Sequence, residues 1–212
     1  MPDQPTFGAD FRELLEQLFV WRRDVRRFQT TAVERELIDE LLAIANLSPS
    51  VGNSQPWRWV EVASARRRAF VQDNFEAANL SAASGYDDGD TRAHYLGLKL
   101  AGLKESPVQF AVFCDPTTSQ GRGLGAQTMP ETLAYSTVTC IHTFWLAARA
   151  RGLGVGWVSI LDSDELRQAL DVPEAWKLIG YLCVGWPVEE HTDPELEREH
   201  WQAREPMRLF QR

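Results

Sequence analysis

The sequence predicts a single α+β domain with few strands and long helices. Two observations favour this fold class. The apolar, β-rich runs are few and short, and one long helical stretch, residues 131–151, is apolar on most of its faces. The chain has 212 residues, which is long enough for one substantial core. Hydrophobic residues make up 44% and charged residues 25%, a balance typical of globular enzymes and not of disordered chains.

Helices are predicted where apolar residues recur at helical spacing. The first covers residues 11–22, and Asp10 and Glu13 are placed like a capping box at its start. A second helix over residues 33–47 should end before Pro49, because a proline disfavours helix in the residue before it. Further helices are predicted at residues 66–80, 92–104, 131–151 and 163–170. The helix at 131–151 should be buried at the centre of the domain.

Strands are predicted at residues 57–62, 108–114, 154–160 and 178–186. The run 108–114 is continuously apolar, which is typical of a central strand. The segment 115–131 is a long, glycine-rich loop of the kind that is usually mobile or functional. The tail, residues 187–212, is polar overall but contains four large apolar residues, and we therefore expect it to pack on a partner subunit. These residues are Trp201, Met207, Leu209 and Phe210.

The charge balance argues against non-specific binding to nucleic acids or anionic membranes. Lys and Arg number 22 and Asp and Glu 30, a formal net charge of −8. An anion must therefore be bound by a local cluster of basic residues. Three widely spaced cysteines in apolar segments predict buried, reduced thiols and a cytoplasmic protein, and no secretory signal is expected. The four histidines show no ligand spacing, so no metal site is expected.

The basic cluster is the stretch "VWRRDVRRFQT", residues 20–30. Arg22 and Arg26 are four residues apart, as are Arg23 and Arg27, so a helix would project each pair from one face. Guanidinium groups on a common face are suited to binding a phosphate. An equally good interpretation is that they complement the negative end of the first helix dipole. Asp24 favours the functional interpretation, because a carboxylate near a helix C-terminus is unfavourable and needs another reason.

Two glycine-rich series do not fit nucleotide motifs. The series "GRGLG" (121–125) lacks the Gly-Lys-Ser/Thr ending of a phosphate loop. The series "GLGVG" (152–156) follows a helix and precedes a strand, the reverse of the dinucleotide fingerprint. We expect it to cap the long helix and to let a strand approach something flat. The loop "SPSVGNSQPW" (48–57) could bind a heterocycle edge or a ribityl chain, but simple turn formation explains its residues better.

Taken together, these stretches resemble the flavin-dependent nitroreductase family. "WRRDVRRF" resembles its N-terminal arginine element, "SPSVGNSQPW" its Pro-Ser-x-x-Asn-x-Gln-Pro-Trp loop, and "GLGVGWVSI" its glycine-rich flavin-facing strand. The order and spacing agree over nearly the whole chain. The resemblance implies a central, mainly antiparallel sheet flanked by helices, bound FMN, and a homodimer with flavin sites at the subunit interface.

Within the family, the chain is similar to a flavin-destructase subgroup that consumes its flavin. Asp24 stands where ordinary nitroreductases usually carry Ser, and "GVGWVSI" ends at Ser159 as in that subgroup. The central stretch "YSTVTCIHTFWLAARARGLGVGW" is also similar throughout. This resemblance implies that dioxygen and reduced FMN react to give 5,6-dimethylbenzimidazole and erythrose 4-phosphate. A separate NAD(P)H-dependent flavin reductase would supply the reduced FMN.

The resemblance also implies roles for individual residues. Asp24 and Ser159 would be the catalytic polar pair near the reacting ring. The residues expected to contact the flavin or its phosphate are Arg22, Arg23, Asp24, Val25, Arg26, Ser50, Leu100, Ser159 and Arg204. Arg27 is expected to be a solvent-facing or structural charge. Neighbouring guanidinium groups would lower the pKa of Asp24 and burial would raise it, so the sequence leaves both an acid and a base role open.

Some features depart from the subgroup, and two other functions fit the same fold. Asn53 is more typical of general nitroreductases, and Ala126 and Leu133 stand where Arg and Asp are expected. The departures concern a lid, for which residues 81–93 and 116–130 are the candidates. The alternatives are an NAD(P)H-dependent nitroreductase or flavin reductase, and a non-catalytic FMN-binding protein.

Overall fold

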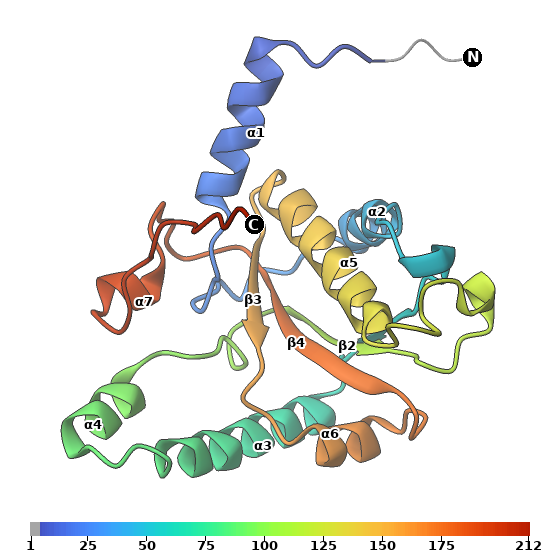
Figure 1. Ribbon diagram of the computed structural model, residues 1–212. Coiled ribbons are helices and arrows are strands. Elements are labelled where there is room, and N and C mark those ends of the chain that lie inside the picture. The colour runs from blue at the N-terminus through green and yellow to red at the C-terminus, as the bar shows by residue number, and fades with distance from the viewer. Residues whose placement is uncertain (1–4) are drawn as a thin grey trace.

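A four-stranded antiparallel sheet forms the centre of the computed structural model, which describes residues 5–212 (Figure 1). The strands lie in the order β1-β2-β4-β3. Their bounds are Trp57–Glu61 for β1, Val108–Cys114 for β2, Gly154–Val158 for β3 and Lys177–Gly185 for β4. All seven residues of β2 are buried, because it lies between two neighbours and has helices on both faces. The predicted α+β class and the central position of this strand are confirmed.

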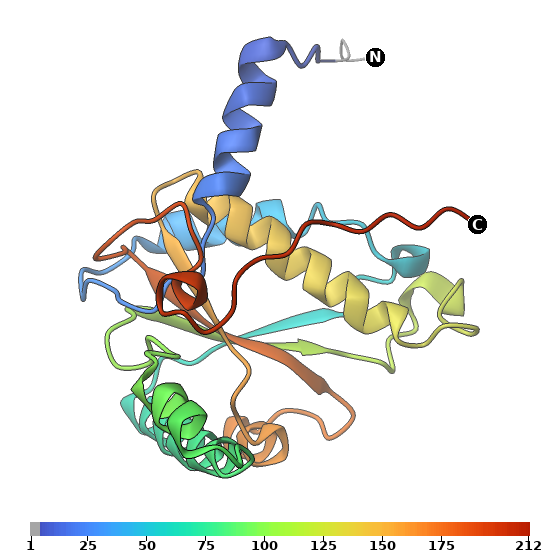
Figure 2. The ribbon, with the colours of Figure 1, turned by 60° about the vertical axis from the view of Figure 1, so that its left-hand side comes forward.

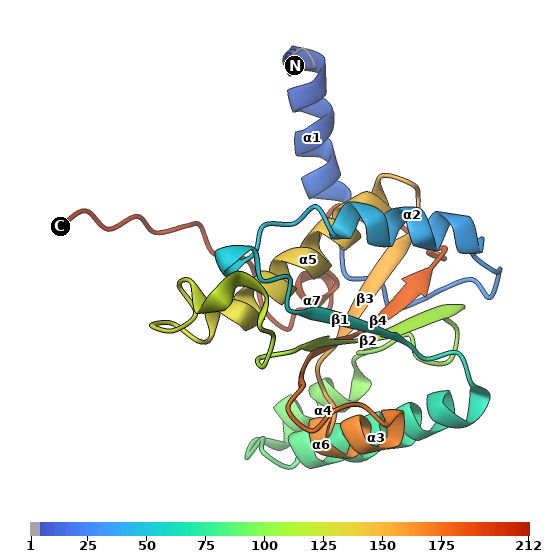
Figure 3. The same cartoon turned by 90° about the vertical axis from the view of Figure 1, so that its right-hand side faces the viewer.

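Helices cover both faces of the sheet, as Figure 3 shows. One face carries α2 (Arg35–Ala45) and α5 (Thr132–Arg149), and the other carries α3 (Ala65–Ala83) and α6 (Ser163–Leu170), with α4 (Gly89–Gly97) beyond α3. The predicted burial of the long helix is confirmed, since half of the positions of α5 are buried, including Ile141 and Phe144. Short 3-10 helices, η1 (Val51–Asn53) and η2 (Gln120–Gly123), lie in the loops beside the start of α5.

The two helical layers give two hydrophobic cores, because successive strand residues face opposite sides of the sheet. On β2, Val112 packs with α2 and α5, whereas Phe113 packs with α3 and α6. On β4, Leu182 belongs to the first core and Tyr181 to the second. The three cysteines are buried and free, as the sequence predicts.

The two ends of the chain extend from this body (Figures 1 and 2). Helix α1 (Ala9–Trp21) projects outward and has no buried residue, although Phe11, Leu14 and Phe19 lie on it. The tail forms the short helix α7 (Glu195–Arg198) and then runs outward to exposed apolar residues at 207, 209 and 210. Among the described residues, no helix is long and apolar enough to cross a membrane.

Two local predictions were wrong. Helix α4 ends at Gly97 and not near residue 104, because the backbone beyond it is extended at Leu98 and the Lys99 carbonyl accepts a hydrogen bond from the N-terminal segment. Helix α1 begins after Gly8 without a side-chain cap, so the expected capping box is absent there. Trp201 of the tail packs within its own chain, with its ring 5.5 Å from His94 and 5.7 Å from Tyr86, and the packing of the tail on a partner subunit stays a prediction.

Candidate functional site

Residues 22–28 form an extended segment beside β3 and not a continuation of α1. Asp24 pairs with Val155 as a parallel bridge, and the Val25 amide donates to the Val155 carbonyl at 3.1 Å. Phe28 pairs with Pro187 on the other side of the segment. The predicted helical arrangement of the arginines is therefore wrong. Alternation along an extended chain nevertheless separates the same two sets, Arg22 with Arg26 and Arg23 with Arg27.

Two glycines of β3 allow this segment to approach. A Cβ atom on Gly156 would overlap the carbonyl oxygen of Val25, and one on Gly154 would lie 2.7 Å from the Val25 side chain. Gly152, with φ +78°, ends the turn after α5 as expected. The structure thus shows one close neighbour of this strand, the chain's own N-terminal segment.

Asp24 is held at both carboxylate oxygens. Oδ1 accepts from the Trp157 amide at 2.8 Å, and Oδ2 accepts from Arg26 Nε at 2.8 Å. The Asp24 side chain is 31% exposed because it faces a concave surface, yet protein surrounds it on the other sides. Burial raises the pKa of Asp24, and the hydrogen bonds from Arg26 and Trp157 offset only part of that effect. The carboxyl group is therefore suited to exchanging a proton nearer neutral pH than an ordinary aspartate.

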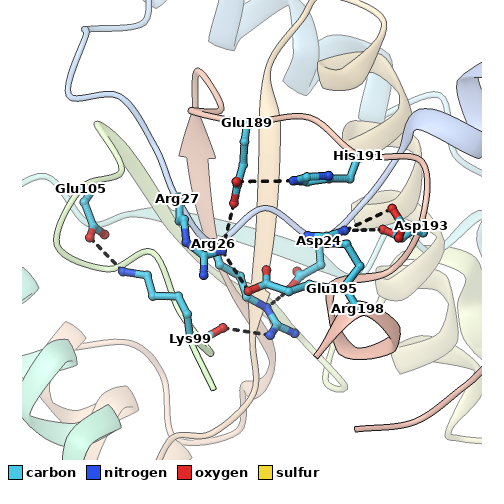
Figure 4. A network of polar contacts seen from close by, with 10 residues as sticks. All are labelled: Asp24, Arg26, Arg27, Lys99, Glu105, Glu189, His191, Asp193, Glu195 and Arg198. Carbon is cyan, nitrogen blue, oxygen red and sulfur yellow. Dashed lines mark hydrogen bonds and ion pairs between the residues drawn. The ribbon is translucent and has the colours of Figure 1, made fainter. Parts of the chain in front are cut away.

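Arg26 connects Asp24 to the residues after α4. Its side chain is 10% exposed, and Nη1 donates to the Lys99 carbonyl at 2.8 Å (Figure 4). Leu100 is the next residue, so the structure brings it to the same region as Asp24. Ser159 lies two residues beyond Trp157 along the chain and is exposed. Its hydroxyl group makes no hydrogen bond within residues 5–212.

Arg22 and Arg204 form a positive region next to this site. The Arg22 guanidinium lies over the Trp145 ring, 5.0 Å from its centroid, and no described side chain accepts a hydrogen bond from it. Its pKa is lowered chiefly by burial and further by the charge of Arg204, while Asp24 acts in the opposite direction. Two guanidinium groups that repel each other in this way favour a bound anion.

Arg23 is occupied by backbone carbonyl groups. Nε donates to Thr192 at 2.9 Å and Nη1 to the Arg22 carbonyl at 2.7 Å, with a longer bond to Phe19. Its side chain thereby fastens the end of α1 to the tail. Arg23 is close to the predicted anion site, but most of its donors serve this structural purpose.

Ser50 is not brought together with the other predicted residues within one chain. Its hydroxyl group accepts from the Gln55 amide at 3.0 Å, and the adjacent Val51 amide donates to Ser136 near the start of α5. Arg22 packs against Trp145, nine residues further along that helix, which corresponds to about 13 Å of helix length.

The sequence did not reveal several groups that build the site. The Trp157 amide and the Lys99 carbonyl are backbone atoms, so no side-chain motif marks them. Arg27 is bonded to Glu189 and Glu195 of the tail, and the density of acidic residues there was the available signal. Within residues 5–212, no group of three or more His, Cys, Asp and Glu side chains is placed to hold a metal ion.

Comparison with known families identifies the family to which this chain belongs. The model described as the nitroreductase family matches residues 19–186, which include the extended segment, the loop at 48–57 and β3. The chain belongs to the nitroreductase family.

Individual relatives match the chain beyond residues 19–186. The chain is 54% identical over 208 residues to a 5,6-dimethylbenzimidazole synthase of Rhodospirillum rubrum, covering 98% of each protein. It is 42% identical over 200 residues to a protein of the same name from Rhodobacter capsulatus, covering 94% of this chain and 96% of that one. Among solved structures of this fold, iodotyrosine deiodinase bound to FMN and 3-iodo-L-tyrosine superposes with a TM-score of 0.72 at 21% identity, covering 93% and 97% of the two chains. The family resemblance predicted from the sequence is confirmed.

Proposed function

We propose that the chain is a 5,6-dimethylbenzimidazole synthase. It would convert reduced FMN and dioxygen to 5,6-dimethylbenzimidazole and erythrose 4-phosphate, with the pyrimidine part of the flavin ring leaving as a separate fragment. The observation that carries the proposal is Asp24, a carboxylate on the segment that crosses β3, held by Trp157 and Arg26 and with a raised pKa. The identity of 54% to the Rhodospirillum rubrum synthase over 98% of both proteins supports the same function.

The residues present fit a flavin mononucleotide. The guanidinium groups of Arg22 and Arg204 leave positive charge without a described carboxylate partner at one end of the site, which suits a phosphate monoester. Asp24, Leu100 and Ser159 provide polar and apolar contacts toward the ring and ribityl chain. Bound reduced FMN supplies both the electrons and the carbon atoms that the reaction needs.

Asp24 and Ser159 are proposed to act on protons. Asp24 would take up or deliver a proton at its carboxylate, because burial raises its pKa above the ordinary aspartate value. Arg26 orients that carboxylate through Nε and remains able to donate from its other N–H groups. The Ser159 hydroxyl, which has no described partner, would donate to or accept from the substrate. Arg23 would add positive charge at the phosphate, and Val25 a backbone contact.

Water must be kept from the reacting flavin, because early release of hydrogen peroxide would consume reduced FMN without forming product. Residues 81–93 and 116–130 are proposed as the lid. The first of these segments contacts the tail through Tyr86, whose ring packs on Trp201, and His94, just beyond the segment, bonds the Glu199 carbonyl at 2.7 Å. The departures at Asn53, Ala126 and Leu133 lie near the second segment.

A homodimer would complete the site. Ser50 lies far from Arg22 within one chain, so a second copy would have to supply it to the same flavin. Exposed apolar residues on α1 and at the end of the tail are suited to packing against such a second copy. They include Phe11, Leu14, Phe19, Met207, Leu209 and Phe210. We also propose a cytoplasmic location, supported by three buried free cysteines, and a separate NAD(P)H-dependent reductase as the source of reduced FMN.

One experiment tests the function. The protein is incubated in air with chemically reduced FMN, and 5,6-dimethylbenzimidazole is sought by chromatography and mass spectrometry. We expect product from the wild type, none without dioxygen, and at least about 100-fold less from Asp24→Asn. Absence of product, with both proteins indistinguishable, would contradict the proposal. Steady NAD(P)H oxidation with a nitroaromatic acceptor would indicate a nitroreductase, and unchanged FMN a binding protein.

A further inference from the structure

Arg27 binds two carboxylates of the tail that differ in their surroundings. Nη1 lies 2.9 Å from Glu195 Oε1 and 3.1 Å from Glu189 Oε1 (Figure 4). The Glu195 side chain is only 8% exposed, whereas that of Glu189 is 45% exposed. The tail therefore presents one buried and one solvated negative charge to the same guanidinium group.

Glu195, the buried carboxylate, lines the same pocket as Asp24. Both carboxylates line a narrow pocket of ≈ 40 Å³ between the extended segment and the tail, together with His191 and Arg198. A volume of this size has room for a few water molecules. The backbone closes the same pocket, because the Val188 amide donates to the Arg27 carbonyl at 3.1 Å.

Many charged side chains line the pocket that Asp24 shares with the tail. They are Arg23, Arg26 and Arg27 of its own segment, Arg149 of α5, and Glu189, Glu190, His191, Asp193, Glu195 and Arg198 of the tail and α7. Arg22 also lies on the segment of Asp24, and Arg26 and Glu195 act on the pKa of Asp24 in opposite directions. The charge of Asp24 acts on the thiol of Cys183 in β4, but burial raises the pKa of this thiol to about 12, so it stays neutral and adds no charge beside Asp24. Of these carboxylates, Glu195 is the one whose charge raises the pKa of Asp24.

We propose that Glu195 is a positioning residue for proton transfer at Asp24, because it holds the extended segment through Arg27 and places a second negative charge beside the Asp24 carboxylate. This inference rests on the proposed function of Asp24. A neighbouring negative charge favours the protonated carboxyl group, so Glu195 keeps part of the Asp24 population protonated at higher pH. Arg27 offsets some of that charge.

Glu195 and Arg27 are therefore expected to change the pKa of Asp24 in opposite directions. Removing the negative charge with Glu195→Gln should lower the pKa of Asp24, whereas removing the positive charge with Arg27→Gln should raise it. Simple loosening of the segment would move both variants in the same direction. Glu189→Gln is the matched control, because it removes an exposed carboxylate from the same guanidinium nitrogen.

The test is a titration of the protein with ¹³C-labelled aspartate carboxyl groups, followed by NMR. The Asp24 signal is assigned by its absence from Asp24→Asn. We expect Glu195→Gln to lower its midpoint by about 0.5 pH units or more, Arg27→Gln to raise it, and Glu189→Gln to leave it within about 0.2 units.

The proposal is overturned if Glu195→Gln keeps the wild-type midpoint, if Glu189→Gln moves it equally, or if Arg27→Gln lowers it. Should Glu195→Gln fail to fold, the direction found for Arg27→Gln decides. The titration needs no turnover, so its failure is distinct from a failure of the synthase activity. In the product assay, the pH profile of Glu195→Gln should move in the same direction as the midpoint.

Discussion

The guanidinium of Arg26 donates from Nε to Asp24 Oδ2 at 2.8 Å and from Nη1 to the Lys99 carbonyl at 2.8 Å. One side chain therefore links the carboxylate on the extended segment to the backbone that follows α4. Arg26, which orients the proposed proton carrier, is thus also attached to the segment that follows α4. A displacement of the backbone at Lys99 should therefore alter the position of the Asp24 carboxylate, and the reverse should also hold.

Asp24→Asn should change stability in a pH-dependent way. The pKa of Asp24 is raised in the folded protein, so its contribution to stability is lost as pH rises from the ordinary aspartate value toward the folded one. The difference in Tm between Asp24→Asn and the wild type should therefore move in favour of the variant between pH 4 and pH 8. Scanning calorimetry over this range measures it. An opposite slope for Asp24→Asn would contradict the assignment.

Arg22→Ala should weaken FMN binding by about 10- to 100-fold, because a charged hydrogen-bond donor to the phosphate is lost. Fluorescence quenching of FMN measures the Kd. Riboflavin, which lacks the phosphate, should bind both proteins alike. Arg35→Ala is a suitable control, since Arg35 pairs with Asp39 and Glu61 away from this site. An equal loss of riboflavin affinity would show that Arg22 does not act on the phosphate.

Arg26→Ala should weaken binding of FMN and riboflavin together. Its guanidinium lies at Asp24 and the Lys99 carbonyl, so its contacts with a flavin would involve the ring and ribityl chain more than the phosphate. The same titrations with the two flavins distinguish this pattern from that of Arg22→Ala. FMN binding as tight as in the wild type would exclude a flavin contact by Arg26.

Ser159→Gly should abolish product formation with little effect on the fold. The side chain is exposed and makes no described hydrogen bond, so its removal should change the free energy of unfolding by less than about 1 kcal/mol. Single-turnover product assays with reduced FMN measure the chemical effect, and urea unfolding measures the stability. Product formation at the wild-type rate would remove Ser159 from the proposed mechanism.

Local sequence patterns predicted most elements of this fold. The apolar run 108–114 forms β2 at its predicted bounds, and residues 163–170 form α6. These elements are determined by periodicity and capping, as the Asp162 side chain shows by accepting from the Asp164 and Glu165 amides. Interactions between neighbouring residues were sufficient to define them.

The geometry of the site was not predictable in the same way. The segment with the arginines is extended because it pairs with Val155 and Pro187, and no local pattern reveals such distant partners. The sequence left the pKa of Asp24 open, since burial and neighbouring arginines act in opposite directions. In the structure, burial has the larger effect, and the pKa of Asp24 is raised. The distance of Ser50 from Arg22 likewise depends on where α5 lies.

The pairing of residues 22–28 also has a consequence for synthesis of the chain. Asp24 leaves the ribosome early, but the Trp157 amide that binds it follows 133 residues later, and Glu195 later still. Contacts of such long sequence separation form late in folding, because closing a long loop carries an entropic cost. Only β1 and β2 can pair before Trp157 is made, because β3 joins the sheet through β4. Asp24 is therefore positioned late, and the contact between Arg27 and Glu195 forms later still.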